Sequence, residues 1–428
     1  MSEHALPSWS RVNLTDLAAY INGYAFKPED WSEHGLPIVR IAQITGSSAD
    51  CDYYQGRLSE DFKIDNGEII FSWSGTLCVV QWNGGPAWLN QHLFKVKPAE
   101  GVSHRLLYHV LFHAVAEMDK SAHGSTMKHI KRSELKRYEL LFPNSRKEQE
   151  KIGRVLDTLD TQIQKTEALI AKLEKVKEGM LHDLLTRGID ENGRLRSSPE
   201  QAPELYKESP LGLIPKEWGV EKLKDLSSNG MINGVFKEVS RAGIGTPLIN
   251  VADLYKGDDI NLGTCERFDA NEVEVGKYDA LPGDVFFTRS SLKLEGIAHC
   301  NWLKIADKPA VFECHIIRVR PSSKVDPRFL VAWCLSSNAR LHFMGNAKQV
   351  TMTTISQDGV GSLPCPVPSI DEQKKASERI LSLERRVADE KLKLSKLSNQ
   401  KQGLMDDLLI GRVRVTPLLD QAQITTPA

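Results

Sequence analysis

The sequence lacks the features that mark membrane, secreted and zinc-stabilised proteins. It has no apolar run of about 18 residues, the length that a transmembrane helix needs. Its amino terminus has no basic stretch followed by an apolar core, which argues against secretion. Its seven cysteines are scattered and form no C-x-x-C pair. We therefore expect a protein of the reducing cytoplasm, without a membrane span and without a structural zinc site.

Catalytic signatures are missing as well. The sequence contains no glycine-rich dinucleotide or phosphate loop, no G-x-S-x-G turn and no H-E-x-x-H motif. The formal net charge is only −1, so any surface that binds nucleic acid must be a local patch. The hydrophobic content of 41% and the charged content of 26% are those of an ordinary soluble protein. With 428 residues, the chain has room for two or three domains.

What the sequence does contain is a long segment that occurs twice, at residues 145–188 and 369–411. Each copy begins with Ser-x-x-Glu, the capping box that starts a helix, and a proline lies just upstream. Each copy ends at a glycine, which is typical of the residue after a helix. One constant offset aligns the shared residues without a gap: Gln149 with Gln373, Gly179 with Gly403, Asp183 with Asp407, Leu184 with Leu408, and Leu185 with Leu409.

Apolar residues recur at steps of three and four along both copies, which predicts two helices of roughly 60 Å, each with a heptad-like stripe. The predicted seam consists of Leu156, Leu159, Ile163, Ile170 and Leu173 in the first copy and Ile380, Leu383, Val387, Leu394 and Leu397 in the second. Two matched stripes in one chain favour packing against each other, and the connectivity then requires an antiparallel coiled coil. The alternative is that each helix dimerises the protein or packs on its own domain.

The segments before the two helices repeat as well. GLPIVRIAQI (35–44) matches GTPLINVADL (245–254), and PAWLNQHLFKVKP (86–98) matches PAVFECHIIRVRP (309–321). Short β-rich segments bounded by glycine and proline predict mostly β units, each with a helical stretch at 105–118 or 328–343. We therefore predict an α+β fold, a tandem duplication with pseudo-two-fold symmetry. The predicted boundaries are globular units at 1–144 and 216–368, helices at 145–188 and 369–412, a linker at 189–215 and a tail at 413–428.

Two weak catalytic candidates remain. Cys314 and His315 are adjacent, but the matching position in the first half holds Gln91, so the thiol is not part of the repeat. Glu68 and Asp284 each follow a glycine where a strand is expected to begin. We interpret the histidine as a core or turn residue and the two acids as turn carboxylates.

Binding features are stronger. A basic run at 128–137 follows Thr126-Met127, and Lys348-Gln349 precedes the matching Thr351-Met352. Such runs are often merely solvated, but their place beside one repeated element favours phosphate contact. The polar residues at the strand ends differ between the halves, as two readers of different DNA sequences would need, and several suit base edges in a major groove. The candidate DNA contacts are Arg40, Gln43, Ser72, Trp73, Ser74, Lys128, Lys131, Arg132, Asn250, Asp253, Arg289, Ser290, Lys293, Lys348, Gln349 and Thr351.

The whole chain resembles the specificity subunit of type I restriction–modification systems. The resemblance lies in the order unit–helix–unit–helix, the run YKESPLGLIPKEW (206–218), the Glu-Gln at each helix start and the Leu-Leu at each helix end. It implies that each globular unit is a target-recognition domain for one half of a bipartite, asymmetric DNA site. It also implies that the helices set the half-site spacing and dock two methyltransferase subunits.

By the same resemblance, the chain is not itself an enzyme. S-adenosylmethionine, ATP and magnesium are expected on partner subunits: two methyltransferases, and the restriction subunits that translocate and cleave DNA. Two other interpretations stay open at this point. The chain could be a scaffold that has lost DNA reading, or an enzyme built on Cys314 and His315 or on the Glu68 and Asp284 carboxylates.

Overall fold

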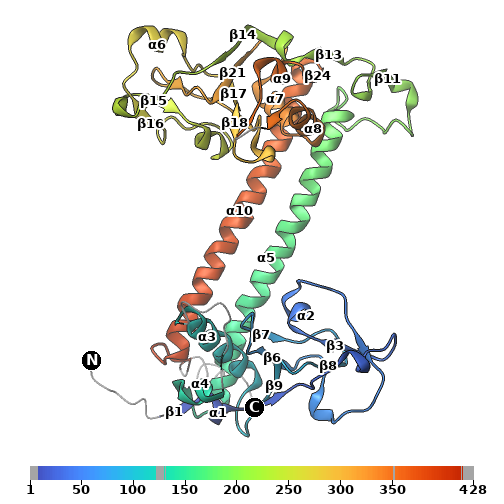
Figure 1. Cartoon of the computed structure of the whole chain (residues 1–428), viewed down its shortest axis with the longest axis vertical. Helices are drawn as coiled ribbons and strands as arrows, with labels where there is room; N and C mark the ends of the chain where they lie inside the picture. Colours follow the sequence, from blue (N-terminus) through green and yellow to red (C-terminus); the bar gives the residue numbers. More distant parts are fainter. Residues whose placement is uncertain (1–7, 122–129, 131, 350–351, 416, 418–428) are drawn as a thin grey trace, which may run out of the picture. The chain divides into compact units, whose positions relative to one another are not determined.

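The computed structural model describes residues 8–121, 130, 132–349, 352–415 and 417. The chain forms two units (Figure 1): unit 1 comprises Met1–Ala168 and Lys391–Ala428, and unit 2 comprises Leu169–Glu390. Each long helix contributes to both units, because α5 (Arg146–Thr186) begins in unit 1 and α10 (Ile370–Leu409) begins in unit 2.

Unit 1 is built on an antiparallel four-stranded sheet. Its order is β2 (Ala18–Asn22), β9 (Leu93–Pro98), β6 (Ile69–Ser72) and β7 (Cys78–Gln81). A second set of strands has the order β4 (Tyr53–Tyr54), β3 (Leu36–Val39), β8 (Ala87–Leu89) and β5 (Lys63–Ile64), with β3 and β8 parallel. A third pair joins β1 (Trp9–Asn13) to β10 (Glu139–Pro143). The shorter elements are α1 (Leu14–Leu17), η1 (Pro28–Asp30), α2 (Ile41–Thr45), η2 (Glu60–Phe62) and α4 (Arg132–Arg137).

Unit 2 repeats the main sheet strand for strand and the rest of this plan with small differences. Its four-stranded sheet has the order β14 (Ser227–Asn233), β21 (Ile316–Pro321), β17 (Val285–Thr288) and β19 (Cys300–Trp302). Its second sheet has the order β16 (Glu266–Phe268), β15 (Ala242–Ile249) and β20 (Val311–Phe312), again with one parallel pair. The counterpart of the β1–β10 pair joins β13 (Gly219–Lys222) to β24 (Pro364–Val367). The predicted duplication is therefore confirmed at the level of topology.

The remaining elements of unit 2 are short. They are η3 (Pro203–Leu205), β11 (Tyr206–Ser209), β12 (Gly212–Pro215), η4 (Leu223–Leu226), η5 (Val239–Arg241), η6 (Val251–Tyr255), α6 (Glu272–Lys277), β18 (Ser290–Ser291), η7 (Leu294–Gly296), α7 (Pro327–Cys334), α8 (Ser337–Gly345), β22 (Lys348–Gln349), β23 (Thr353–Thr354) and α9 (Gln357–Gly361). None of the helices in the described part of the chain combines the length and the hydropathy of a membrane span.

A hydrophobic core lies between each main sheet and its helices. In unit 1, α3 (His104–Ser121) turns one apolar face, which includes Leu107 and Leu111, towards Phe71 and Phe94 of the sheet. The first turns of α5 and the last turns of α10 close the same core, through Leu156 and Leu408 among others. In unit 2 the last turns of α5 and the first turns of α10 share a core in the same way.

Within each unit, the beginning of one long helix thus packs with the end of the other. This is the antiparallel pairing that the two stripes predict, and the α+β class is confirmed. All the predicted seam residues are buried or half-buried: Leu156, Leu159, Ile163, Leu394 and Leu397 in unit 1, and Ile170, Leu173, Ile380, Leu383 and Val387 in unit 2. Thr166, a polar residue between Ile163 and Ile170 of the first stripe, is buried as well, and its hydroxyl donates to the main-chain oxygen of Gln162 at 2.8 Å.

The sequence-based picture differs from the structure at three places. Residues 41–45 form helix α2, because the Gln43 side chain accepts from the amide of Arg40 and caps a helix in a segment that we expected to be extended. The expected single helix at 328–343 is two helices, since the Ser336 hydroxyl accepts from the amide of Ala339 and starts α8. The segment 189–215, expected to be a surface linker, contains the β11–β12 hairpin and buries Tyr206.

Candidate nucleic-acid interface

In unit 2, several predicted DNA contacts gather on one small sheet. Strands β18 and β22 pair with opposite edges of β23, which places Ser290, Lys348 and Gln349 in one three-stranded sheet although the two segments are far apart in the sequence. The side chains of Lys348 and Gln349 are exposed, and the exposed Lys293 follows β18 on the next loop. Two cations and two polar groups therefore lie at one edge of unit 2.

The isoleucine of the repeated Thr-Met-x-x-Ile motif makes the same backbone contact in both units. The amide of Ile130 donates to the carbonyl of Trp73 at 2.9 Å, and the amide of Ile355 donates to the carbonyl of Arg289 at 3.0 Å. Both carbonyls belong to the residue that follows the central strand, β6 or β17. Ile130 and Ile355 therefore lie at the edge of each main sheet where β6 and β17 end, which we call the loop edge and where candidate contacts lie.

Arg132 is held in place at this edge of unit 1. Its guanidinium donates to the main-chain oxygen of Tyr20 at 2.7 Å and to Oδ1 of Asn22 at 3.2 Å, and it lies 5.4 Å from the ring centroid of Phe94. The remaining N–H groups of this fork can still reach an anion. In unit 2, Arg289 is held less firmly, since Nη1 donates to the main-chain oxygen of Cys314 at 3.3 Å.

Ser72 and Ser74 are not accessible to a DNA groove in this structure, contrary to our prediction. Both are buried: the Ser72 hydroxyl donates to the carbonyl of Ser74 at 3.3 Å, and the Ser74 hydroxyl lies 3.2 Å from Nδ1 of His92. Trp73 between them is half-buried and packs against Phe94. These three residues therefore shape the loop, and Trp73 is the one that keeps some exposure.

Four other predicted contacts lie where β3 and β15 end: Arg40, Gln43, Asn250 and Asp253. In unit 1, Gln43 caps its own helix and donates to the carbonyl of Asp50 at 2.6 Å, while Arg40 pairs with Asp52. The polar atoms of Arg40 and Gln43 thus bind within the protein and hold the connection that follows β3.

The unit 2 counterparts behave in the same way. Asp253 is buried; it accepts from the amide of Asn250 at 2.9 Å and from the ammonium of Lys256 at 2.9 Å. The Asn250 amide group donates to the carbonyl of Leu248 and to the Glu266 carboxylate, both at 3.3 Å. Asp253 is thus a buried cap and not a surface acceptor. The predicted contacts Lys128, Lys131 and Thr351 lie outside the described residues.

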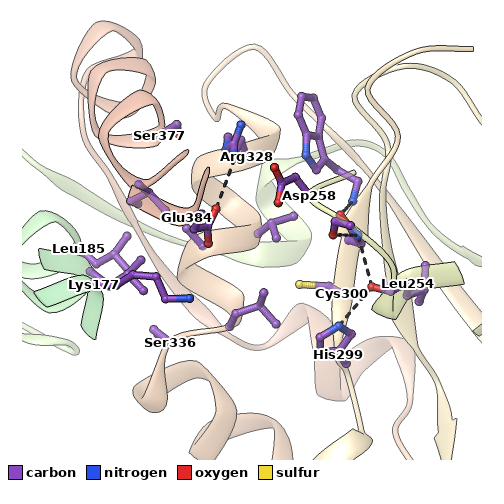
Figure 2. Close-up of a pocket in the computed structure, with 18 of the residues that line it drawn as sticks. Lys177, Leu185, Leu254, Asp258, His299, Cys300, Arg328, Ser336, Ser377 and Glu384 are labelled. Atoms are coloured by element: carbon purple, nitrogen blue, oxygen red, sulfur yellow. Dashed lines mark hydrogen bonds and ion pairs between the residues drawn. The ribbon is translucent and has the colours of Figure 1, made fainter. Parts of the chain in front are cut away.

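Unit 2 also contains a cavity of about 390 Å³ beside its main sheet (Figure 2). Apolar side chains of α5, α7 and α10 form much of its wall, and Arg328 pairs with Glu384 across one side. On the other side, His299 stacks on Tyr255 with ring centroids 4.0 Å apart. Burial lowers the pKa of His299, so its ring favours the neutral form, which lies 3.2 Å from the carbonyl of Leu254.

The carboxylates that follow a glycine have structural partners, as predicted. Glu68 pairs with the ammonium of Lys95 at 2.7 Å and accepts from the amide of Asp65. Asp284 is buried and pairs with Arg320 at 2.7 Å; this hydrogen-bonded pair raises the pKa of the arginine. These pairings join the turn to the neighbouring strand in both units.

The acid that starts each long helix makes long-range polar contacts that the sequence did not predict. Glu372 is the capping-box acid of α10, but its carboxylate accepts from the amide of Ile189 at 2.8 Å, from the indole of Trp218 at 3.2 Å and from Arg196. It therefore joins the start of one helix to the segment that follows the other. The matching Glu148 also contacts a distant segment, because it accepts from Arg414 at 2.9 Å.

The neighbouring glutamines were also missed. Gln149 is buried and joins Ser103, just before α3, to Pro143: it accepts from the amide of Ser103 at 2.7 Å and donates to the carbonyl of Pro143 at 2.9 Å. Gln373 makes the corresponding contacts with Asp326 and Pro368 at 2.8 and 2.9 Å. The repeated Glu-Gln pair is thus a structural joint that both units need. Within the described residues, histidine, cysteine and carboxylate side chains do not gather in groups of three or more that could hold a metal ion.

Comparisons with known proteins agree with this organisation. The family model described as "Type I restriction modification DNA specificity domain" matches residues 8–175 and 215–399, one match in each half. The EcoBI specificity subunit of Escherichia coli is 24% identical over 387 residues, which cover 88% of this chain and 79% of that relative. The MjaVIII specificity subunit of Methanocaldococcus jannaschii is 22% identical and covers 96% of this chain and 94% of the relative.

Among solved structures, the S subunit of a type I restriction–modification system from M. genitalium has the same fold. It superposes with a TM-score of 0.58 at 16% identity, over 96% of this chain and 98% of the other. The family model thus matches each half of the chain once, and each half contains one copy of the duplicated sheets and one long helix. The chain therefore belongs to the family of type I restriction–modification DNA specificity proteins.

Proposed function

We propose that each unit reads one half of a bipartite, asymmetric DNA site and that the two long helices set the spacing between the halves. The observation that carries this proposal is a framework built twice with different polar residues at its loop edge. Trp73 and Arg289 accept the same backbone hydrogen bond at matching positions, yet one is an aromatic residue and the other a cation. Identical loops would read the same bases twice, whereas divergent loops on one framework can read two different half-sites.

The exposed cations at these edges supply the phosphate contacts that position a DNA reader. Lys293, after β18, and Lys348, on β22 of the same small sheet, are exposed in unit 2, and Arg132 lies at the corresponding edge of unit 1. Because the whole chain has a formal charge of −1, such local patches have to provide the attraction for DNA. Partner subunits that bind the same duplex would add to it.

We further propose that the chain is the non-catalytic member of a larger complex. In this account two methyltransferase subunits dock on the helices and bring S-adenosylmethionine, and restriction subunits bring ATP and magnesium. The support is chemical: Glu68 and Asp284 are paired with basic side chains in turns, and Cys314 is not part of the repeat. The helices have polar outer faces that are free to meet other proteins, and their stiffness suits a spacer better than a flexible linker.

The direct test is a map of methylated adenines in the source genome with and without this gene. We expect one bipartite motif to lose its methylation when the gene is deleted. An unchanged map would contradict DNA reading and would favour a scaffold role for the helix pair.

The spacer role has its own test. Inserting four residues, about one helical turn, after Thr166 should change the number of unspecified bases between the half-sites or abolish recognition. The bases of each half-site should stay the same, because the inserted residues lie in neither globular part. A change in the bases themselves would contradict the proposed division of labour.

A further inference from the structure

The loop after β18 carries a leucine that is almost completely exposed. Leu292 keeps 86% of its surface accessible, although a leucine side chain is among those most often buried. It lies between β18 and η7, at the loop edge where the candidate DNA contacts gather. A large aliphatic side chain in this position gains nothing from the fold of unit 2 and is free to be buried by a ligand.

Hydrogen bonds on both sides of Leu292 hold the loop rigid. The amide of Lys293 donates to the Ser291 hydroxyl at 3.2 Å, and the amide of Gly296 donates to the carbonyl of Lys293 at 3.1 Å. The far end is fixed by Tyr255, whose hydroxyl donates to the carbonyl of Gly296 at 3.0 Å, and by Arg340, which donates to the carbonyl of Glu295 at 2.9 Å. Leu292 is therefore presented in a fixed position, which lowers the entropic cost of inserting it into a ligand.

The strand register places a second apolar side chain beside it. Ser291 and Gln349 both lie opposite Thr353. The next residue after Ser291 is Leu292, and the residue before Thr353 on the neighbouring antiparallel strand is Met352, which is 38% exposed. Exposed lysines flank this apolar pair, Lys293 on the loop and Lys348 on β22. An apolar tip bordered by cations fits an anionic partner with an apolar interior, which is the chemistry of stacked bases between phosphates.

Unit 1 shows that the scaffold does not require this feature. There, β6 is joined to β7 by residues 73–77, whereas β17 is joined to β19 by the longer segment 289–299. The leucine of the shorter connection, Leu77, is half-buried and packs on the core of unit 1. The exposed leucine thus belongs to an addition in unit 2, on a sheet that folds without it in unit 1.

On the basis of the proposed function, we propose that Leu292, with Met352 beside it, is an apolar wedge that inserts between two base pairs of the half-site read by unit 2. Insertion partly unstacks one base step, and its cost depends on the sequence of that step. The wedge therefore selects a deformable step, such as a pyrimidine–purine step, without a hydrogen bond to a base. A docking surface for protein would instead present a broad, contiguous apolar patch, whereas Leu292 and Met352 are only two side chains.

The test uses the full chain assembled with its methyltransferase partners and a duplex that carries the bipartite site identified by the methylation map. 2-Aminopurine, whose fluorescence rises on unstacking, replaces single adenines along both half-sites. Apart from the target adenines, which methyltransferases flip out of the duplex, we expect binding of the wild type to raise the fluorescence at one step only. Leu292→Ala should remove most of that rise and weaken specific binding about tenfold, and Leu292→Met should restore both.

Val239→Ala is the matched control, because Val239 is 88% exposed on a different loop of unit 2; it should bind and unstack DNA like the wild type. Both variants should melt like the wild type, since neither side chain is buried. Equal binding and unstacking by wild type and Leu292→Ala would overturn the wedge and leave the proposed function standing. So would a Leu292→Ala protein that fails to assemble with its partners, because Leu292 would then be a protein contact. A wild type that does not bind the duplex would overturn the proposed function itself.

Discussion

The two units share a framework and differ at its loop edge. Both have the same strand order in the main sheet, a parallel pair in the second sheet and the same backbone hydrogen bond from a matching isoleucine, Ile130 or Ile355. They differ in the connection after the central strand, which in unit 1 is short and centred on Trp73 and in unit 2 is long and carries Leu292. Duplication preserved the parts that hold a fold together and left free the parts that would meet different DNA sequences.

In both units the capping-box glutamate joins the start of a long helix to a distant segment, but Glu372 binds more groups than Glu148. Glu372 binds three groups in unit 2, and its partner Arg196 has a side chain that is only 10% exposed. Glu148 binds only Arg414 in the described part of unit 1, and that arginine is 26% exposed. The stability of unit 2 should therefore depend more on the contacts of Glu372 than the stability of unit 1 depends on the contact of Glu148.

Glu372→Ala should have the largest effect. It leaves the Arg196 guanidinium largely buried without its main partner and removes the acceptor of Ile189, which should cost about 3 kcal/mol of unfolding free energy. Denaturant unfolding of the full chain measures this loss. Glu167→Ala, at an exposed position of α5, is the control and should change little. A loss below about 1 kcal/mol would show that the joint is unimportant.

Glu148→Ala should destabilise the protein by a smaller amount. Its partner Arg414 can turn towards water once the carboxylate is gone, so we expect a loss of about 1–2 kcal/mol in the same measurement. Equal losses for the Glu148 and Glu372 variants would contradict the difference drawn between the two joints.

Removing the exposed polar pair of β22 should weaken DNA binding without affecting the fold. Lys348→Ala combined with Gln349→Ala removes one phosphate contact and one candidate base contact, so we expect about tenfold weaker binding and a shallower salt dependence. Titration of labelled duplex at several salt concentrations measures both. The control is Lys391→Ala on α10. A double variant that binds like the wild type would remove this edge from the interface.

A pH-dependent difference between the units should be the smallest effect. His109 of unit 1 is buried between Asp157, Asp160 and Lys401, and at the matching position of α7 unit 2 has Ala332. Burial lowers the pKa of His109 below its ordinary 6.5, so the folded state favours the neutral ring. The contribution of the neutral ring to the free energy of unfolding is fully present above pH 6.5. It is lost as the pH falls below 6.5 and through the lowered pKa of the folded state.

His109→Gln should therefore reduce the fall in melting temperature between about pH 7.5 and about pH 5.5. His34→Gln, at an exposed site of unit 1, is the control and should leave that fall unchanged. An unchanged pH dependence in the His109 variant would assign the acid sensitivity to other buried histidines, such as His299.

The long helices and the duplication could be predicted because their signals are periodic and local. The stripes through Leu156 and Ile380 and the left-handed glycines after the helix ends, Gly188 and Gly411, are all present. The partners of Glu148 and Glu372 could not be predicted, because a capping motif fixes a position on a helix and not the distant segment that packs against it.

The candidate contacts were harder to predict for a physical reason. A polar residue at a strand end can face solvent or cap the next turn, and sequence alone does not distinguish the two. Gln43 and Asp253 turned inwards as caps and Ser74 became buried, while Lys348 and Gln349 stayed exposed. The exposure of Leu292 was not predicted, because hydrophobic residues are normally assigned to a core.

The central claim is that the two units read their half-sites independently, and an exchange of one unit tests it most directly. Residues 1–144 are replaced by the matching region of a relative with another specificity, and methylated adenines are mapped genome-wide. We predict that one half of the bipartite motif changes to the donor's bases while the other half and the spacing stay as they were. A change in both halves, or in neither, would contradict the account.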